Sequence, residues 1–531
     1  MLTPVSYTHL AMKKDEDNGN ATYQGLKERA EGLAIKANAA LAFVHPEILA
    51  IPATDLSLWL QNEELSLYSR YLGEITRMAP HIRNAAEEEI LALAGDLTMA
   101  PRNIFSMFNN ADLKFPVITD EDGNQVEITH GNYIVLMESQ NREVRKAAFQ
   151  GMYGAYGRAK NTLAATLAAN VKKNVFQAKV RNYPSAISAA LFGEEIPVKV
   201  YDQLIAGIRK HLPLFFEYLE LRKKALGVEE LHLYDVYTPL YQEKQRHIPY
   251  EEAVETVLAA LAPLGEDYVR DARQAFSQGW VDVLENQGKT SGAYSSGVYG
   301  TKPFILLNYQ YNLNSVFTLA HELGHSMHSY YSNQNQPYIY SDYEIFVAEV
   351  ASTVNETLLL RHLLDQETDR QKRLLLVNYY LDQFRGTVFR QTMFAEFEKL
   401  IHQQAEKGLP LSCEYFQETY YQLNQDYFGS GMVIDREIDM EWSRIPHFYR
   451  SFYVYKYATG FTAATALVQG ILEQGRPAVE KYRGFLAGGC SDSPINLLRR
   501  AGVDMTDAAT LDRAFLVYAD FLKELRALLA D

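Results

Sequence analysis

The sequence predicts a mostly α-helical protein, and three observations support this fold class. Apolar residues recur at helical spacing over 22–111, over 142–180 and again from about residue 198. Signals for extended structure are few and short, namely a hairpin at 115–129 and a strand at 303–309. The composition, with 47% hydrophobic and 22% charged residues, is typical of a globular protein.

The elements follow in order along the chain. A polar run, K-K-D-E-D-N-G-N at 13–20, predicts a mobile start. Amphipathic spacing then predicts a helix at 26–42. The hairpin at 115–129 is predicted because β-branched residues flank the turn sequence D-E-D-G-N. One long helix is expected at 142–180, where only three glycines weaken the pattern, and 228–236 predicts a linker or a short strand.

Length, charge and cysteine content limit the possible functions. The 531 residues are enough for two or three domains. A net charge of −15 makes nucleic acid and anionic membranes poor partners. Two distant cysteines, Cys413 and Cys490, fit a reducing compartment rather than a disulfide framework or a cysteine zinc site. No apolar run of the ~18 residues that a membrane span needs and no signal peptide are recognised, so a cytoplasmic protein is expected. The oligomeric state is left open.

One motif, H-E-L-G-H beginning at His321, has the chemistry of a metal site. It lies in a predicted helix that Asn314 or Ser315 caps. Because positions four apart lie on one face of a helix, His321 and His325 point the same way and can share one Zn²⁺. Glu322 is turned about 100° from the first histidine, so its carboxylate lies beside a metal-bound water rather than on the metal. The alternative is a surface helix with two exposed histidines.

A third metal ligand is expected from the next helical segment, at 344–356. Glu349 lies among apolar residues there, and a buried carboxylate has to be paired or bound to metal. Glu349 is therefore the expected third ligand, with Glu344 and Glu356 as alternatives. Glu356 follows on roughly the same face and could instead accept a hydrogen bond from a ligand histidine.

Two other residues near the motif fail as metal ligands. His328 shares a face with His321 but lies two turns away, too far to share one tetrahedral ion. The longer metzincin pattern also fails, because Tyr331 stands where its third histidine would be. The sequence thus predicts one zinc ion per chain, held from two helices.

The segment ahead of the motif can contribute to ligand binding. Residues 288–300 are rich in glycine and small polar residues and lead into the strand at 303–309. The Gly-Lys-Ser/Thr ending of a phosphate loop is missing. A strand next to a metal-binding helix can hold an extended peptide by adding it to a sheet. An ordinary loop followed by a core strand is the alternative.

These motifs resemble the oligoendopeptidase F branch of the thimet oligopeptidase family. The resemblance runs from about residue 22 to the C-terminus and rests on the H-E-L-G-H helix, F-V-A-E-V-A-S at 346–352, the strand at 303–308, the helix at 142–180 and R-I-P-H-F-Y at 444–449. It implies a helical, two-lobe metallopeptidase that encloses a deep central cleft, with a small β-sheet beside the zinc helix. It also implies His321, His325 and Glu349 as zinc ligands and Glu322 as the base.

The resemblance gives a role to the tyrosine-rich run at 447–457. Peptide hydrolysis passes through an oxyanion that needs hydrogen-bond donors besides the metal. In the wider family a histidine and tyrosines after the zinc helices serve this role, and His447 and Tyr453 match them. Beyond these the match is ambiguous between Tyr455 and Tyr457, and Tyr457 is included among the expected catalytic residues. The alternative is an aromatic core stripe.

The resemblance also suggests how the chain is divided. We expect a disordered or foreign segment at 1–21, an N-terminal helical lobe at 22–190 and a catalytic zinc metallopeptidase domain at 191–531. Relatives of this type usually begin with more sequence ahead of residue 22, and the first dozen residues here do not resemble it. An N-terminally truncated chain with a foreign start is therefore expected.

Together these features predict a zinc-dependent endopeptidase that hydrolyses internal bonds of short peptides through a metal-activated water. Glu322 would carry the proton from water to the leaving amine, His447 and Tyr453 would bind the oxyanion, and the strand at 304–308 would hold the peptide. Short peptides are the expected partner. Two alternatives stay open, a zinc carboxypeptidase of the same family and a non-catalytic helical protein that binds peptides.

Overall fold

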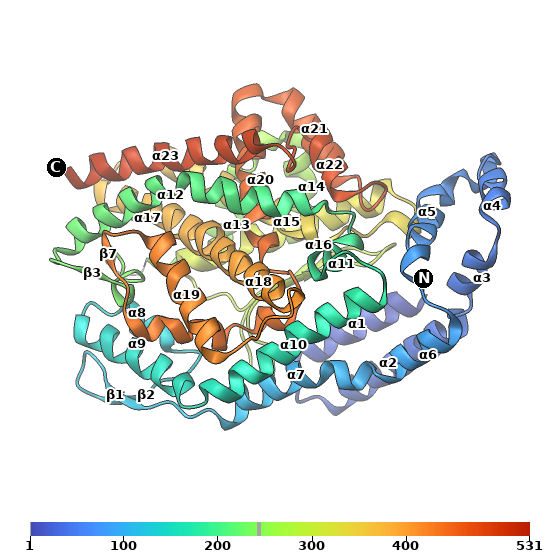
Figure 1. Cartoon of the computed structure of the whole chain (residues 1–531). Coiled ribbons are helices and arrows are strands. Elements are labelled where there is room, and N and C mark those ends of the chain that lie inside the picture. Colours follow the sequence, from blue (N-terminus) through green and yellow to red (C-terminus); the bar gives the residue numbers. More distant parts are fainter. Residues whose placement is uncertain (1, 242–245, 531) are drawn as a thin grey trace. The chain divides into compact units, whose positions relative to one another are not determined.

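The computed structural model describes residues 2–241 and 246–530 (Figure 1). Helices account for 72% of the chain, which confirms the mostly α-helical fold. The residues cluster into two compact units, which we call unit 1 and unit 2. Unit 1 comprises Met1–Ile82, Lys244–Gln366 and Gly460–Met505, and unit 2 comprises Arg83–Glu243, Glu367–Thr459 and Thr506–Asp531. Each unit is built from three separate segments, so this division differs from the boundaries expected at residues 21 and 190, which stay predictions.

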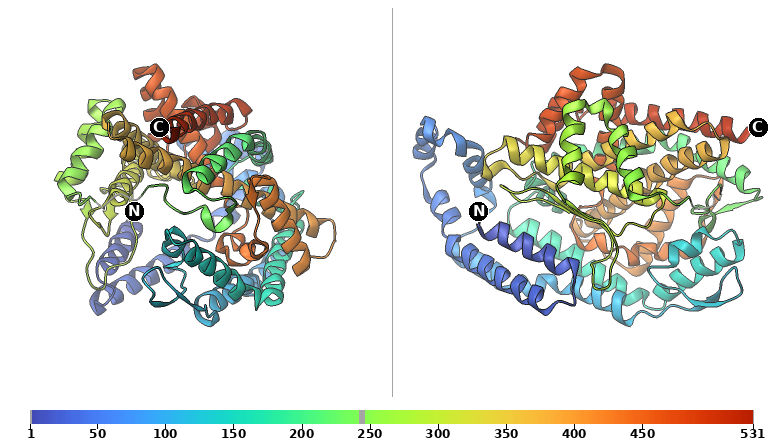
Figure 2. Two further views of the ribbon diagram at one scale, coloured as in Figure 1. Left: turned by 90° about the vertical axis from the view of Figure 1, so that its left-hand side faces the viewer. Right: turned by 180° about the vertical axis from the view of Figure 1, so that it is seen from behind.

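Unit 1 begins with helix α1 (Leu2–Glu16), where the sequence predicts a disordered start. This helix packs along α2 (Ala21–Leu41), and the pair is drawn in dark blue in Figure 2. Asp15 accepts hydrogen bonds from the hydroxyls of Thr290 at 3.0 Å and Tyr294 at 3.1 Å. The expectation of disorder is wrong for this segment because its polar residues find partners in the glycine-rich stretch, a contact that local sequence does not reveal.

A second difference concerns the stretch from Ala21 to Ala50. It reaches a mean hydropathy of 1.2 over 18 residues, and none of that window is buried. By length and composition it could cross a membrane, so the expectation of no apolar run of this length is wrong here. The secondary structure divides it, since α2 ends at Leu41 and α3 (Val44–Ala50) begins three residues later. One exposed apolar stretch of this kind is weak evidence for a membrane.

The rest of unit 1 is mostly helical. Its further long elements are α4 (Ala53–Trp59), α5 (Ser69–Arg77), α13 (Tyr250–Ala260), α14 (Glu266–Ser277), α15 (Leu313–Asn335), α16 (Ile345–Gln366), α21 (Arg476–Leu486) and α22 (Pro494–Arg500). The helix with the H-E-L-G-H motif is α15, and its cap is Asn312, whose side chain accepts the Ser315 N–H at 2.9 Å. The predicted caps, Asn314 and Ser315, are wrong because the helix begins earlier, at Leu313.

A three-stranded sheet lies beside α15 in unit 1, with the order β4 (Val281–Asp282), β6 (Phe304–Leu306) and β5 (Tyr294–Ser296). The predicted strand at 303–309 is confirmed as β6. It pairs in parallel with β4 and antiparallel with β5, so both of its edges are already used. The expectation that this strand holds a peptide is therefore wrong. Within the described residues the outer edge of β5 has no strand partner, and β5 packs against α15, where Ser295 Oγ lies 2.8 Å from Ser326 Oγ.

Unit 2 contains the predicted hairpin and the predicted long helix. The hairpin is confirmed, with β1 (Val117–Thr119) antiparallel to β2 (Gln125–Glu127). The long helix is instead two helices, α9 (Arg142–Gly157) and α10 (Lys160–Val180). Gly151 fits where the hairpin meets α9, because a Cβ there would lie 2.5 Å from Ile128 Cδ1. Gly151 therefore serves close packing, and Gly157 is the last residue of α9.

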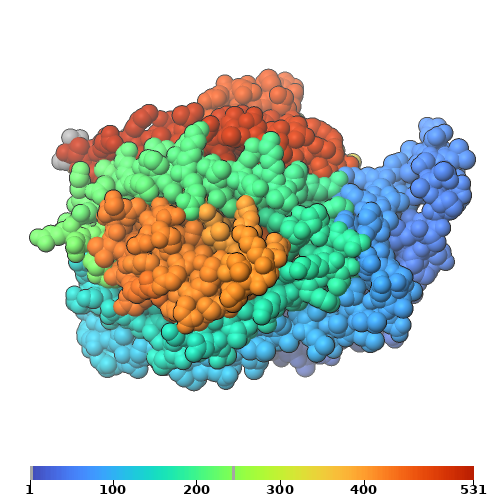
Figure 3. All heavy atoms as spheres, viewed as in Figure 1, coloured from blue at the N-terminus to red at the C-terminus, as the bar shows by residue number. Residues whose placement is uncertain are grey.

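Unit 2 contains further helices, namely α6 (Ala85–Leu93), α7 (Gly95–Met107), α8 (Tyr133–Glu138), α11 (Ala186–Phe192), α12 (Val198–Leu226), α17 (Arg370–Phe384), α18 (Arg390–Glu406), α19 (Cys413–Phe428) and α23 (Ala508–Ala530). Of these, α7, α11, α18 and α19 pack against α10. Figure 3 shows α18 and α19 in orange at the surface beside the green α12, and these three helices contact one another. The short strand β3 (Leu231–His232) pairs in parallel with β7 (Met432–Val433). Of the two predictions for 228–236, a linker or a short strand, the short strand is therefore confirmed.

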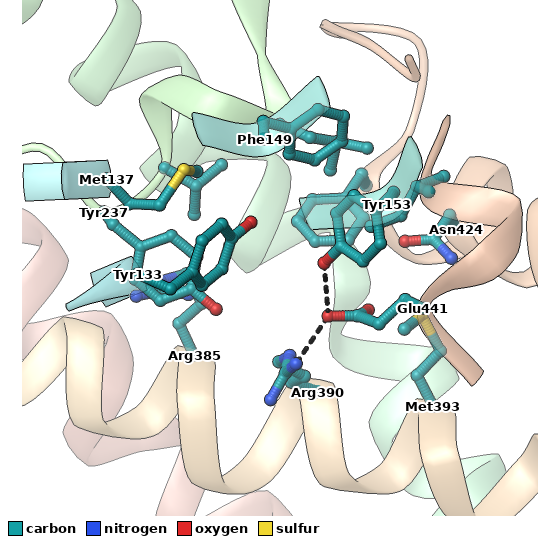
Figure 4. A pocket seen from close by; sticks show the side chains of 14 residues that line it. Tyr133, Met137, Phe149, Tyr153, Tyr237, Arg385, Arg390, Met393, Asn424 and Glu441 are labelled. Atoms are coloured by element: carbon teal, nitrogen blue, oxygen red, sulfur yellow. Dashed lines mark hydrogen bonds and ion pairs between the residues drawn. The ribbon is translucent and has the colours of Figure 1, made fainter. Parts of the chain in front are cut away.

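Unit 2 also contains a small cavity of about 30 Å³ that apolar and polar side chains line (Figure 4). Glu441 accepts hydrogen bonds there from the Tyr153 hydroxyl at 3.1 Å and from Arg390 at 2.6 Å. Because one water needs roughly 10–15 Å³ of such space, the cavity has room for about two waters. It is too small to be the peptide site that the sequence predicts.

Candidate active site

The two motif histidines lie one turn apart on α15, and the carboxylate of Glu349 comes from α16. His321 Nε2 and His325 Nε2 are 3.1 Å apart. Glu349 Oε2 lies 3.4 Å from the first of these nitrogens and 3.5 Å from the second. Ligand atoms about 2.1 Å from a tetrahedral ion are about 3.4 Å from one another. The three donor atoms therefore have the spacing that a single small cation requires.

Gly324 allows the two helices to approach closely enough to form this group. A Cβ at position 324 would lie 2.6 Å from the Ala351 carbonyl oxygen and 2.6 Å from the Ser352 Cα. Asn355 fixes the same contact, since its buried Nδ2 donates to the Ala320 carbonyl at 3.1 Å. The fourth residue of H-E-L-G-H thus sets the separation of the helices that carry the donors.

Glu356 lies behind His321. Its Oε1 is 3.4 Å from His321 Nδ1, so Nδ1 faces Glu356 while Nε2 faces the donor group. Burial lowers the pKa of His321, but the hydrogen bond to Glu356 and the charges of Glu349 and Glu322 outweigh it and raise the pKa to about 9. A carboxylate on the far nitrogen is the usual way of orienting a metal-binding histidine.

Glu349 is less buried than its apolar neighbours suggest. Phe346, Val347 and Val350 point into the core, whereas 38% of the Glu349 side chain is exposed. The premise that Glu349 is buried is therefore wrong, because it lies on another face of α16. Ser352 Oγ donates to its Oε2 at 3.1 Å. Burial raises its pKa, but the hydrogen bond with His325 and the histidine charges lower it to about 2, so the carboxylate is ionised as a metal ligand must be.

Glu322 follows His321 on α15 and is 7% exposed. Its side chain is not part of the group of three donor atoms. Burial raises the pKa of its carboxyl, although the two motif histidines oppose this shift. A buried carboxylate with a raised pKa beside a metal group is suited to taking and returning a proton.

Glu344 and His328 lie outside the group of three donors. Within the described residues, His321, His325 and Glu349 are the one set of three such donors close enough for a metal, and Glu344 is not among them. His328 is buried and stacks on Tyr343 with ring centroids 3.7 Å apart. Burial lowers its pKa to about 3, so it is a neutral core residue.

His447 forms an aromatic cluster with Tyr453 and Tyr457 in unit 2. The Tyr457 hydroxyl lies 3.3 Å from His447 Nε2. The His447 and Tyr453 rings are parallel with centroids 5.7 Å apart, and the Tyr453 and Tyr457 rings meet edge to face at 5.4 Å. Burial and the positive charges of Arg450 and Arg390 lower the pKa of His447, which favours the neutral imidazole. All three residues are partly exposed.

The structure distinguishes between Tyr455 and Tyr457, which the sequence leaves as alternatives. Tyr455 is 0% exposed, and its ring lies 5.0 Å from that of Tyr201 in the core of unit 2. Tyr457 is the one that joins His447. Helical spacing could not have found this, because Tyr453 lies ahead of the helix that begins at Tyr455. The sequence does not single out Asn355, which joins α16 to α15, because nothing near it in the sequence points to α15.

Comparisons with known proteins identify the family of this chain. The chain matches a sequence model of peptidase family M3 over residues 135–517 and one of oligopeptidase F over 47–115. Oligopeptidase PepF of Bacillus subtilis is 52% identical over 98% of this chain and 78% of its own length. An oligoendopeptidase F homolog of Lactococcus lactis is 43% identical over 98% of this chain and 87% of its own.

Solved structures give the same result. Oligoendopeptidase-F from Enterococcus faecium superposes with a TM-score of 0.77 at 41% identity, over 99% of this chain and 90% of that one. A chain from Chlamydophila abortus superposes with a TM-score of 0.94 at 36% identity, over 98% of this chain and 88% of that one. The fold class and family expected from the sequence are confirmed. The chain belongs to peptidase family M3 and is a metallo-oligopeptidase of the oligopeptidase F type.

Proposed function

We propose that this enzyme holds one Zn²⁺ through His321, His325 and Glu349 and hydrolyses internal bonds of short peptides. The observation that carries the proposal is the triangle of two imidazole nitrogens and one carboxylate oxygen, with sides of 3.1, 3.4 and 3.5 Å. Three such ligands suit catalytic zinc, which keeps a fourth position open. Bound there, the ion would acidify a water and polarise the scissile carbonyl.

Glu322 is the proposed base and acid. Its carboxylate takes a proton from the attacking water and later gives it to the leaving amine. The raised pKa that burial gives this carboxyl brings it closer to the pH at which both transfers are efficient. Glu356 keeps His321 in the tautomer that presents Nε2, and Ser352 fixes the orientation of the Glu349 carboxylate.

His447, Tyr453 and Tyr457 are the proposed donors to the oxyanion. Neutral His447 and the two hydroxyls carry three polar hydrogens, of which one lies in the hydrogen bond between Tyr457 and His447, so the partly exposed cluster can direct two to an oxyanion. Continuity of the chain supports the assignment, because Tyr457 lies three residues before Gly460 in α20 (Tyr455–Gln474). A Cβ built on Gly460 would lie 3.5 Å from Glu349 Cβ.

The outer edge of β5 is the proposed binding surface for the peptide backbone. Within the described part of the chain this edge has no strand partner, and β5 packs against α15. An extended peptide would add a strand there through main-chain hydrogen bonds. Because such bonds do not read side chains, we expect broad residue specificity. The two free cysteines fit a reducing compartment, and a cytoplasmic location is part of the proposal.

Hydrolysis of a fluorogenic peptide blocked at both ends tests the proposal, with the metal content of the purified protein measured in parallel. We expect about one zinc per chain and cleavage inside the peptide, lost after chelation and restored by Zn²⁺. A requirement for a free C-terminus would instead show a carboxypeptidase. Peptide binding without metal or cleavage would show a non-catalytic protein and overturn the proposal.

A further inference from the structure

Two buried polar side chains in unit 2 hold the segment that carries His447 and Tyr453. Asn170 of α10 donates from Nδ2 to the Phe448 carbonyl at 2.8 Å. Glu398 of α18 accepts the Phe452 N–H on Oε1 at 2.7 Å. Asn170 and Glu398 are both 0% exposed. Their two hydrogen bonds therefore fix the backbone directly after His447 and directly before Tyr453.

Phe452 has an unusual backbone conformation. Its φ is +49°, in the left-handed region that non-glycine residues with large side chains rarely adopt. The side chain is 2% exposed, and its ring contacts Tyr201 at 5.7 Å and His402 at 4.6 Å between centroids. A strained residue persists only when its surroundings over-determine it. Here the aromatic packing and the Glu398 hydrogen bond together do so.

Stability alone does not explain a glutamate at position 398. Its Oε1 accepts the Phe452 N–H, whereas its buried Oε2 has no hydrogen-bond partner within the described residues. Burial raises the pKa of the carboxyl to about 8, which shows that the site disfavours its charge. A buried carboxyl with a single partner is unfavourable compared with an apolar side chain of similar size. What Glu398 does locally is accept the Phe452 N–H, which stabilises the left-handed conformation of Phe452.

We infer that Glu398, assisted by Asn170, is a positioning residue that holds Tyr453 and His447 in the geometry for oxyanion binding. The left-handed turn at Phe452 reverses the chain so that the Tyr453 ring lies parallel to the His447 ring at 5.7 Å. Without the acceptor on Glu398 the turn relaxes, and Tyr453 leaves this position. The inference rests on the proposed role of His447 and Tyr453, and it assigns Glu398 no contact with substrate.

Two substitutions of Glu398 test this inference, because one keeps the hydrogen-bond acceptor and the other keeps only the volume of the side chain. Glu398→Gln keeps an oxygen for the Phe452 N–H, and we expect kcat within about threefold of wild type. Glu398→Met fills the space without an acceptor, and we expect kcat to fall by about 10- to 100-fold while KM and zinc content stay unchanged. Thr392→Val is the matched control, because Thr392 is buried on the same helix and its hydroxyl has no hydrogen-bond partner among the described residues. A fall in thermal stability of Glu398→Met with unchanged kcat would overturn the inference.

A double-mutant cycle tests the route through Tyr453. If Glu398 acts by placing Tyr453, Glu398→Met should reduce kcat much less in a Tyr453→Phe background than in wild type. Equal reductions in both backgrounds would contradict the inference and leave the proposed function intact. No effect of Tyr453→Phe and His447→Gln on kcat would instead remove the proposed oxyanion donors, and the inference with them. Should Glu398→Met fail to fold, Asn170→Ala provides the same cycle from the other end of the segment.

Discussion

Gly324 on α15 packs directly against the backbone of Ser352 on α16, where an added Cβ would lie 2.6 Å from the Ser352 Cα. The neighbouring atoms belong to a helix backbone and are unable to turn aside as a flexible side chain would. The distance between the histidines and Glu349 therefore depends on the absence of one methyl group.

Gly324→Ala should weaken metal binding and stability together. Overpacking of this kind typically costs about 1–3 kcal/mol. We expect zinc content below one per chain and a lower unfolding temperature. Gly484→Ala in α21 is the control, because that helical position has nothing within 4 Å of a new Cβ. A Gly324→Ala protein with full zinc and wild-type stability would show that the helices can separate without consequence.

Glu322→Gln should keep its zinc and lose turnover. The amide fills the same space but is unable to take a proton, and such losses range from about 10² to 10⁴ in kcat. Measurement requires kcat and metal content on the same preparation. Turnover retained in the zinc-loaded variant would remove Glu322 from the role of base.

Glu349 and Glu356 should differ in how strongly they affect the metal. Glu349→Ala removes a proposed ligand, so we expect zinc to be lost on dialysis. Glu356→Gln weakens only the partner of His321 Nδ1, and changes of this kind reduce metal affinity by about 10- to 100-fold. Competition with a zinc chelator measures both. Equal affinity in the two variants would contradict the different roles proposed for these carboxylates.

Glu398→Gln should make unfolding less dependent on pH. The folded-state pKa of Glu398 is raised to about 8 by burial, whereas the ordinary value is about 4.3. Between these values the folded protein keeps a proton that the unfolded chain has lost, so raising the pH favours unfolding. Relative to Glu398→Gln, wild type should lose about 1 kcal/mol of stability per pH unit over this range. Urea denaturation at pH 5.5 and 7.5 measures it, and a constant difference between the two proteins would show a normal pKa.

The metal group was predictable from sequence because it depends on local spacing. His321 and His325 are one helical turn apart in any α-helix, and Glu349 lies in the next helix along the chain. The break between α9 and α10 was not predictable to the residue, since glycine weakens a helix without fixing where it ends. The direction of Glu349 also escaped prediction, because apolar neighbours surround positions on every face of α16.

Contacts between distant residues explain most of what the sequence does not show. Glu398 and Phe452 are 54 residues apart, and no local pattern reports that one holds the other. The central position of β6 depends on pairing with β4 and β5, which the sequence of one strand does not specify. Tyr455 and Tyr457 have similar neighbours in the chain, but one lies in the core and the other beside His447.

The contact between α1 and the glycine-rich segment has a practical consequence. Asp15 holds Tyr294, the first residue of β5, and Asn18 donates from Nδ2 to the Gly288 carbonyl at 2.9 Å. An affinity tag or fusion partner joined ahead of α1 would thus disturb the contacts of α1 with β5, the strand that we propose binds the peptide. Kinetic constants should be compared only among proteins with the same residues before α1, because tag removal is itself a change near the substrate.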